Sequence, residues 1–189
     1  EEKYLKKAIN YYRKRGEDPP YQGKFETIFC NKFNNFMGKS GFSDAVSSGC
    51  AAIYVSLASL NIPKNSEILL SPVTCSSDLS VVLLQGFKPV LVDSAKNSYN
   101  VNLNEVKKKI TKKTKAAILT HAAGEPIPEI SKIAKYLKKN KIFLIEDCSQ
   151  AHGAYPKNNK TKVGNYGDIA AFSMMYRKNI AMGGSGGMV

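Results

Sequence analysis

The stretch IFLIED at residues 142–147 is an apolar run that ends abruptly in two carboxylates. A second apolar run, IAAFSMMY at residues 169–176, leads within two residues to Lys178. Both runs are short and apolar, which is typical of strands buried on both faces of a parallel sheet. The two stretches therefore predict two buried strands, with Asp147 and Lys178 placed at or just beyond their ends.

Similar short β-like runs recur from about Ser43 and alternate with helical patterns. We expect strands at residues 44–46, 67–70, 89–92, 116–120, 142–145 and 169–173. Between them we expect helices at residues 51–60, 79–85, 103–110 and 128–139. Repeated strand–helix–strand units form a parallel sheet with covering helices. The sequence thus predicts the α/β class, with a mostly parallel central sheet and helices on both faces.

An aromatic stripe at helical spacing precedes this alternation, at Phe25, Ile28, Phe29, Phe33 and Phe36. With Gly38 as a stop, it predicts a core-packing helix. Residues 11–23 contain two glycines and two prolines, which predicts an extended arm able to cross onto a partner.

The expected domain division is an N-terminal arm at residues 1–23 and one large domain at residues 24–189. The glycine-rich stretch at residues 183–187 resembles a turn that feeds another strand. We therefore expect the chain to be incomplete at its C-terminus, with a small C-terminal domain absent.

Composition restricts the class of protein. No apolar stretch approaches the roughly 20 residues of a membrane span, and we expect a cytoplasmic protein. The four cysteines are widely separated and the two histidines are few, so neither a disulfide scaffold nor a metal site is expected. The formal net charge of +13 is spread over what look like outer helix faces, which favours a solvated surface over a nucleic-acid partner.

Lys178 and Asp147 are the residues most suggestive of chemistry. A buried lysine amine can form a Schiff base with the aldehyde of pyridoxal phosphate, and a strand-end carboxylate can keep the pyridine nitrogen protonated. Most of the 25 lysines must be solvated surface charges, but Lys178 follows a mostly uncharged stretch. Asp147 also fits the more ordinary role of a helix cap.

Other polar residues are expected at the same edge of the sheet. The stretch SSGCAA at residues 47–52 joins a strand to a helix start, where free amides bind anions, although it also suits a plain N-cap and tight turn. Ser173 lies five residues before Lys178, where its hydroxyl can reach the same anion. Gln150 lies three residues after Asp147, on the same face if a helical turn follows, and is otherwise a surface amide. Loops after parallel strands converge on one crevice.

Six motifs occur in order: SGCAA (48–52), SPVTC (71–75), GFKPVLVD (86–93), THAAGEP (120–126), EDCSQAHGA (146–154), and FS (172–173) ahead of Lys178. Together they resemble the sugar-nucleotide aminotransferases, the DegT-type branch of the fold type I pyridoxal phosphate enzymes. The resemblance extends from about Gly23 to the end of the chain. It implies the large domain of the aspartate aminotransferase-like fold.

The resemblance also implies roles for individual residues. Lys178 would hold pyridoxal 5'-phosphate and act as the catalytic acid and base, with Asp147 at the pyridine nitrogen and Gln150 at the oxygen side of the ring. Ser173 would hold the phosphate with the amides of a helix start.

That helix start consists of Gly49 and Cys50. The family usually has threonine or serine in place of Cys50, and an aromatic residue commonly stacks on the ring where Cys75 stands.

The implied function is transfer of an amino group from glutamate, through pyridoxamine phosphate, to a keto group of a nucleotide-linked sugar, for cell-surface polysaccharide or another glycoconjugate. The family further implies a homodimer with a shared active site. Some members carry histidine at the lysine position and dehydrate instead, so Lys178 favours transamination. The alternative is a cofactor-poor relative that acts as a binding or regulatory module.

Overall fold

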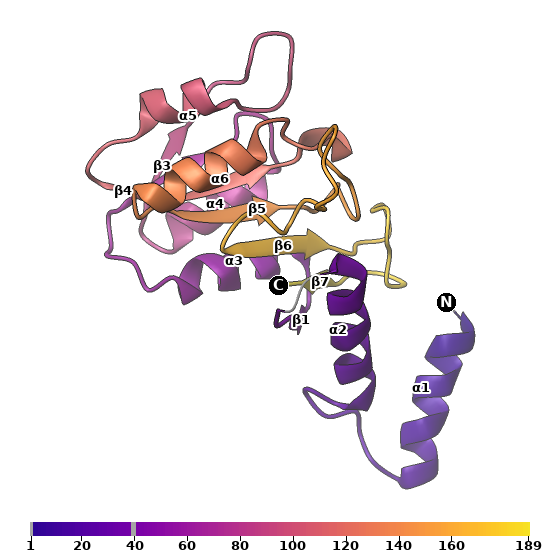
Figure 1. Ribbon diagram of the computed structural model, residues 1–189. Coiled ribbons are helices and arrows are strands. Elements are labelled where there is room, and N and C mark those ends of the chain that lie inside the picture. Colours follow the sequence, from indigo (N-terminus) through magenta and orange to yellow (C-terminus); the bar gives the residue numbers. More distant parts are fainter. Residues whose placement is uncertain (1, 39–40) are drawn as a thin grey trace. The chain divides into compact units, whose positions relative to one another are not determined.

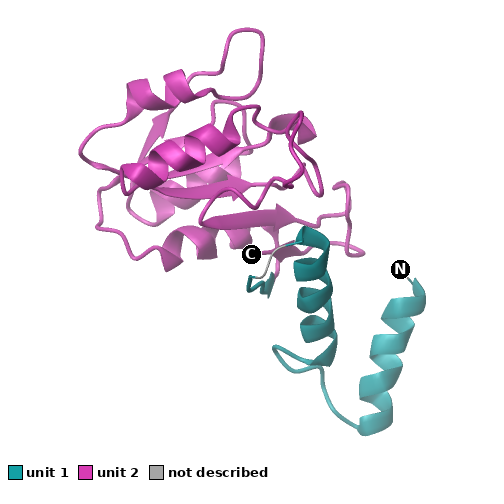
Figure 2. Ribbon diagram, in the orientation of Figure 1, with its two compact units in different colours: residues 1–45 teal, residues 46–189 magenta. Residues whose placement is uncertain are grey.

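The computed structural model describes residues 2–38 and 41–189. The chain divides into two compact units, residues 1–45 and residues 46–189 (Figure 2). Within the described residues, no helix combines the length and the apolar character needed to cross a bilayer.

The first unit contains helices α1 (Glu2–Arg15) and α2 (Lys24–Met37). The predicted helix at the aromatic stripe is confirmed by α2, which ends at Gly38 with a φ of 79°. The expectation of an extended stretch over residues 11–23 is wrong for residues 11–15, which belong to α1. The breakers in that stretch start only at Gly16, and Tyr12 lies on an apolar face that packs edge-on against Phe25 at 5.8 Å between ring centroids.

A seven-stranded sheet organises the rest of the chain, in the order β1-β7-β6-β5-β4-β2-β3 (Figure 1). Its strands are β1 (Ala45–Val46), β2 (Glu67–Leu70), β3 (Lys88–Leu91), β4 (Thr114–Thr120), β5 (Phe143–Asp147), β6 (Ile169–Ser173) and β7 (Gly187–Met188). The pairs β3–β2, β2–β4, β4–β5 and β5–β6 are parallel, and β7 runs antiparallel to β6. The predicted mostly parallel sheet is confirmed, as is a strand after the glycine-rich turn.

The helices of the second unit are α3 (Gly49–Ser59), α4 (Ser76–Leu84), α5 (Leu103–Lys109) and α6 (Ile130–Lys139), with a short 3-10 turn η1 (Ala122–Gly124). They cover both faces of the sheet, because alternate residues of β4 enter different apolar clusters. Ala116 and Ile118 pack with residues of α3 and α4, whereas Ala117 and Leu119 pack with residues of α5 and α6. Figure 1 shows the sheet between these helix pairs. Burial on both faces explains why each inner strand is a continuous apolar run.

Candidate functional site

The candidate site lies at the carboxyl ends of β4, β5 and β6, within the second unit. The parallel register pairs Thr120 with Asp147, and Asp147 with Ala171, so these strand ends lie side by side. Asp147 closes β5 with 3% of its surface exposed, and Ser173 closes β6 with 8% exposed. The sheet therefore brings two of the predicted residues to one edge, as open α/β sheets do at ligand sites.

The start of α3 meets the end of β6 in unusually close contact. A Cβ atom on Gly49 would lie 2.6 Å from Cβ of Ser173 and 3.0 Å from its Oγ. Ser48 caps the helix by accepting the N–H of Ala51 on its Oγ at 3.1 Å. The N–H groups of Gly49 and Cys50 belong to the first turn, which has no intrahelical acceptors for them. Two amides, a helix dipole and the Ser173 hydroxyl together form a set of donors suited to an anion.

Asp147 is a buried carboxylate with little hydrogen bonding of its own. Oδ1 accepts the backbone N–H of Ser149 at 2.9 Å, and this is the only hydrogen bond to its side chain within the described part of the chain. No described lysine, arginine or histidine forms an ion pair with it. A buried carboxylate needs several donors or a cation to remain charged. Asp147 is thus prepared to accept a cationic N–H group from a ligand.

Lys178 lies in the segment that follows β6 and is half-buried. Its backbone N–H donates to the carbonyl of Met175 at 2.8 Å, and in the described residues its ammonium group has no ion-pair partner. Its charge acts on two nearby side chains. It contributes to lowering the pKa of Cys75, after the larger effect of hydrogen bonds from Ser77, and it lowers the pKa of His152, after the effect of burial. Lys178 therefore lies near both side chains.

Cys75 is the exposed N-cap residue of α4. Its thiol is free and exposed to solvent. Cys50, in the first turn of α3, is exposed as well. Both cysteines that we expect to depart from the family pattern are thus exposed to solvent.

Gln150 occupies a tight turn after β5, in which the Ala151 N–H donates to the Cys148 carbonyl at 2.9 Å. The structure assigns no helix there. The carbonyl of Gln150 accepts a hydrogen bond from Nδ2 of Asn179 at 3.3 Å, which joins this turn to the segment that carries Lys178. The turn and the lysine segment are therefore linked directly.

His152 belongs to the site, although sequence reasoning gave it no role. Both of its ring nitrogens are buried and neither has a hydrogen-bond partner among the described residues. Its ring lies 5.5 Å from that of Phe172. Burial lowers the pKa of His152, and the Lys178 charge lowers it further, which favours the neutral imidazole. Its place within the EDCSQAHGA motif was the available signal.

Asp78 is a second buried carboxyl group near Asp147 that sequence reasoning missed. It has 2% of its surface exposed, and its Oδ2 accepts a hydrogen bond from Thr74 Oγ1 at 2.6 Å. Thr120 Oγ1 lies 3.3 Å from the same oxygen. Burial, followed by the charge of Asp147, raises the pKa of Asp78 to about 6.

A third buried carboxylate, Glu146, precedes Asp147 in β5 and forms several hydrogen bonds. It accepts Nε2 of His121 at 3.1 Å and the backbone N–H groups of Gly164, Tyr166 and Gly167 at 2.7–2.9 Å. Burial alone would raise the pKa of Glu146, but the His121 hydrogen bond and the backbone amides outweigh it and hold the pKa below its ordinary value.

His121, Glu146 and Cys148 also lie within 4.8 Å of one another, which is close enough for a metal site. His121 Nδ1 accepts the N–H of Ile127 at 3.0 Å, so Nε2 carries the ring proton and donates it to Glu146. Burial raises the pKa of Cys148 well above its ordinary value, which disfavours the thiolate that a metal requires. The hydrogen bonds of His121 to Glu146 and to Ile127 instead hold these segments together.

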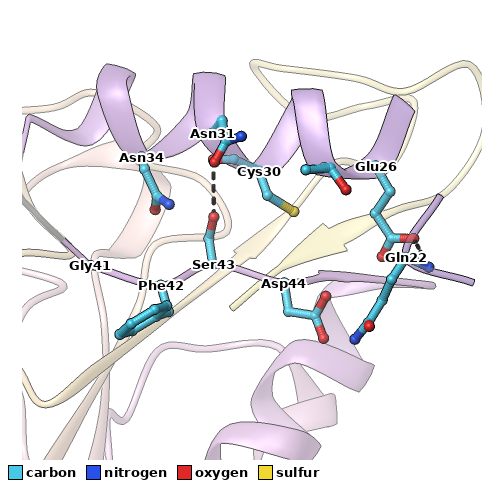
Figure 3. Close-up of a pocket in the computed structure, with 10 residues that line it drawn as sticks. Gln22, Glu26, Cys30, Asn31, Asn34, Gly41, Phe42, Ser43 and Asp44 are labelled. Atoms are coloured by element: carbon cyan, nitrogen blue, oxygen red, sulfur yellow. Dashed lines mark hydrogen bonds between the residues drawn. The ribbon is translucent and has the colours of Figure 1, made fainter. Parts of the chain in front are cut away.

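A separate pocket of about 530 Å³ lies within the first unit, between α2 and residues 41–44 (Figure 3). Its lining is mostly polar and includes Glu26, Asn34 and Asp44. Ser43 closes one side by donating its hydroxyl to the Cys30 carbonyl at 3.1 Å. None of the predicted site residues lines it.

Comparisons with known proteins identify the family of this chain. The sequence pattern of the DegT/DnrJ/EryC1/StrS aminotransferase family matches residues 15–189. The GDP-perosamine synthase of Escherichia coli O157:H7 is 32% identical over 168 residues, which is 89% of this chain and 45% of that protein.

Two solved structures share the fold. An aminotransferase from Psychrobacter cryohalolentis is 31% identical, with a TM-score of 0.82 over 88% of this chain and 41% of that one. An E. coli GDP-4-keto-6-deoxy-D-mannose-3-dehydratase with bound hydrated PLP is 26% identical, with a TM-score of 0.80 over 89% of this chain and 44% of that one. The chain spans less than half the length of each of these relatives.

Proposed function

Because the chain belongs to the DegT/DnrJ/EryC1/StrS aminotransferase family, we propose that it forms the cofactor-binding part of a pyridoxal phosphate-dependent aminotransferase that acts on a nucleotide-linked sugar. One observation carries this proposal. Three groups lie together at one edge of the sheet: a helix start suited to an anion, a buried carboxylate with a single hydrogen bond, and a half-buried lysine. These three groups are contributed by Gly49, Asp147 and Lys178.

The residues present fit the cofactor. Ser173 and the amides of Gly49 and Cys50 would hold its phosphate, where the absence of a Cβ on Gly49 keeps the helix start against β6. Asp147 would accept the pyridinium N–H, which supplies the cation that this buried carboxylate lacks. Lys178 would hold the aldehyde carbon. When bound, pyridoxal phosphate supplies an electron-withdrawing ring that stabilises negative charge on the substrate carbon.

The chain's own residues would then manage protons and orientation. Nζ of Lys178 would take a proton from the substrate carbon and return it at the end of amino transfer, as a general base and then a general acid. Asp147 would keep the pyridine nitrogen protonated by its negative charge. The lowered pKa of His152 favours an uncharged ring beside the ammonium of Lys178. Cys75 and Gln150 would contact the ring, with Cys75 offering a thiol in place of an aromatic face.

Substrate, donor and assembly belong to the same proposal. The name of the E. coli relative, GDP-perosamine synthase, supports a nucleotide-linked keto sugar as amino acceptor, with the product used for polysaccharide or another glycoconjugate. We propose glutamate as amino donor, with pyridoxamine phosphate as the form of the cofactor between the two half-reactions. We also propose a homodimer that shares its sites, because Cys50 and Cys75 of the candidate site are exposed to solvent in one copy. Four unpaired cysteines favour a cytoplasmic location.

The second candidate function is a cofactor-poor relative that binds or regulates without turnover. The thiol of Cys75 favours it, because a thiol offers little π-face contact to a cofactor ring.

The test is covalent capture of the cofactor. Purified protein is mixed with pyridoxal phosphate, its visible absorption is recorded, and borohydride is added before peptide mapping by mass spectrometry. We expect an absorption band that borohydride removes and an adduct on Lys178. Lys178→Ala should lose both, whereas Lys138→Ala, which removes an exposed lysine of α6, should keep both. A wild-type protein without an adduct on Lys178 would contradict the enzyme proposal and favour the binding module.

A further inference from the structure

The positive charge of the chain is concentrated in two segments of the second unit. Residues 107–115 and 132–141 contain eleven lysines and no acidic residue. The rest of the chain carries 17 basic and 15 acidic side chains, so it contributes only +2 to the net charge of +13. Nine of the eleven lysines are exposed, and the other two are half-buried. Almost all of the net charge therefore comes from these two segments.

The fold brings the two segments together on one side of the sheet. The first leads from the end of α5 into β4, and the second leads from α6 to the start of β5. Helices α5 and α6 cover the same face of the sheet (Figure 1), and Nζ of Lys107 lies 5.0 Å from the ring centroid of Tyr136. Parallel pairing of Ala116 with Phe143 sets the starts of β4 and β5 side by side. The lysines thus gather around α6 and the amino-terminal edge of the sheet, whereas the candidate site lies at the carboxyl-terminal edge, about 20 Å away along β4.

The other face of the sheet has a different character. Its helices α3 and α4 contain no lysine or arginine. They expose apolar side chains instead, among them Tyr54, Val55, Leu79 and Leu83. The two faces therefore suit different kinds of partner, and the lysine-rich face suits an anionic one.

Two ordinary roles of surface lysines account for only part of this set. Lysines in the last turn of a helix complement its dipole, which covers three residues of α5 and two of α6. Ion pairs with carboxylates hold three lysines, at N–O distances of 2.7–3.2 Å: Lys108, Lys109 and Lys132. Five lysines lie outside these last turns and pair with no described carboxylate: Lys112, Lys113, Lys115, Lys135 and Lys141. Solubility does not require them, because a net charge of about 2–8 is enough for a small domain.

The residue types favour an anionic lipid surface over a nucleic acid. Every basic residue of the two segments is a lysine, whose compact, hydrated ammonium group is attracted to diffuse negative charge. Arginine, whose planar fork suits bidentate contacts with phosphates and bases, is absent from both segments. Phe143 lies at the same edge, at the start of β5, with 39% of its surface exposed. An exposed aromatic ring with flanking lysines suits the lipid headgroup region, where the ring meets apolar chains and the ammonium groups meet phosphates.

We propose that the lysines of residues 107–115 and 132–141, which form the lysine surface, dock the protein on a membrane that carries anionic lipids. Electrostatic attraction falls off within about 10 Å at moderate salt, so the docked lysines lie close to the headgroups. Each lysine near such a surface strengthens binding by about fivefold. Docking through the amino-terminal edge leaves the carboxyl-terminal edge, with the candidate site, directed away from the lipid. The proposal goes beyond the proposed function and does not depend on it, because no residue of the candidate site belongs to the lysine surface.

The experiment measures sedimentation of the purified protein with vesicles of phosphatidylcholine alone and of phosphatidylcholine with an equal amount of anionic phosphatidylglycerol. Binding is recorded at about 0.1 M salt and at about 1 M salt, where the Debye length falls to about 3 Å. The test variant removes four exposed lysines of the lysine surface: Lys112→Gln, Lys113→Gln, Lys138→Gln and Lys139→Gln. The matched control removes four exposed lysines elsewhere: Lys32→Gln, Lys96→Gln, Lys157→Gln and Lys160→Gln. Both variants lose four positive charges from the same total of +13, so they differ only in where the charge is removed.

We expect the wild type to bind the anionic vesicles at low salt, to leave them at high salt, and not to bind phosphatidylcholine alone. The test variant should bind at least about 100-fold more weakly, and the control should stay within about fivefold of the wild type. Equal weakening in both variants would show that net charge alone attracts the lipid, and would overturn the proposal. Absence of wild-type binding, or binding that persists at high salt, would overturn it as well. Capture of pyridoxal phosphate on Lys178 tests the proposed function separately, so either proposal can fail without the other.

A second measurement uses only wild-type protein and tests the docked orientation. Acetic anhydride modifies exposed lysines, and mass spectrometry compares the extent of modification with and without anionic vesicles. We expect the vesicles to protect Lys113 and Lys139 and to leave Lys96, in the loop that follows β3, as reactive as in the free protein. Equal protection of all three lysines would contradict docking through the lysine surface.

Nucleic acid is the other polyanion that a lysine-rich surface attracts. The salt titration is therefore repeated with a mixed-sequence DNA duplex at equal phosphate concentration. We expect weaker binding to the duplex than to the anionic vesicles. Tighter binding to the duplex, lost in the test variant and kept in the control, would overturn the lipid proposal and assign the surface to a nucleic acid.

Discussion

Replacing Gly49 by alanine is the most direct test of the anion-binding geometry. The new Cβ would lie 2.6 Å from Cβ of Ser173 and 3.2 Å from its Cα, and both of those atoms are fixed by strand β6. Ordinary carbon–carbon contact is about 3.5–4.0 Å. The start of α3 must therefore retreat by about 1 Å from the end of β6. The retreat separates the two amides of the helix start from the Ser173 hydroxyl.

The magnitude follows from two opposing effects. Overpacking of this kind costs about 1–3 kcal/mol, and alanine recovers up to about 1 kcal/mol relative to glycine in a helix. The net loss of about 1–2 kcal/mol corresponds to a fall in Tm of roughly 2–8 °C for a chain of this size. The loss of one hydrogen bond to a charged phosphate costs a further ~1.5 kcal/mol in binding, or about tenfold in affinity for pyridoxal phosphate.

The assay is thermal unfolding without cofactor, followed by titration with pyridoxal phosphate. Gly184→Ala is the control, because a Cβ there would meet no atom within 4 Å. Both Tm and affinity should be close to wild type in the control and reduced in Gly49→Ala. If Gly49→Ala matched the wild type in both measurements, close contact between α3 and β6 would have no role in stability or in phosphate binding.

Three further predictions concern other parts of the unit. The pKa of Asp78 is raised in the folded protein from 3.8 to about 6. Between these two pH values the folded protein binds more protons than the unfolded chain. Its free energy of unfolding therefore falls as pH rises, by up to about 3 kcal/mol. Urea unfolding without cofactor should show this decline in wild type and not in Asp78→Asn, and parallel curves would contradict it. Glu146→Ala should leave one buried donor, Nε2 of His121, and three partly buried backbone donors without their acceptor. An unpaired buried donor costs about 1–3 kcal/mol, so we expect rapid proteolysis near residues 164–167, and an unchanged digestion pattern would exclude a role of Glu146 in holding this loop. Iodoacetamide at neutral pH should modify exposed Cys75, whose pKa is lowered by hydrogen bonds from Ser77, and spare buried Cys148, with pyridoxal phosphate slowing the reaction at Cys75. Mass spectrometry measures this, and preferential labelling of Cys148 would refute it.

The sheet was predictable because its inner strands are buried on both faces. The predicted run at residues 169–173 coincides with β6, and that at residues 67–70 with β2. The first residue of a helix was harder to predict from the sequence where the helix begins with polar residues. Helix α4 begins at Ser76, three residues before the expected start, because serines and an aspartate in a first turn look like loop composition. Residues 11–15 were missed as helix because the breakers that follow them dominated that stretch.

The candidate site also has a part that the sequence predicts and a part that it does not. Asp147, Ser173 and Lys178 could be selected from sequence because each follows an apolar run, and parallel strands carry their carboxyl ends to one edge. The contact between Asp78 and Thr120 joins residues 42 apart in sequence. It exists because β2 pairs with β4 and lies between it and β3, and neither periodicity nor composition encodes that strand order. The position of each residue along its strand was predictable, but its neighbour on the next strand was not.

The hydrogen bonds of Glu146 have a consequence for how this region can diverge in evolution. Its carboxylate accepts backbone amides from Gly164, Tyr166 and Gly167, so it recognises the path of that loop and none of its side chains. Side chains of the loop that make no contact with the core can therefore change while the backbone hydrogen bonds to Glu146 stay in place. Two glycines are restricted, because a Cβ on Gly167 would come within 2.6 Å of the Leu144 carbonyl oxygen and Gly164 has a φ of 86°. Val163 is buried and Tyr166 packs against the apolar cluster of α5 and α6, so these side chains help Glu146 to hold the loop's course.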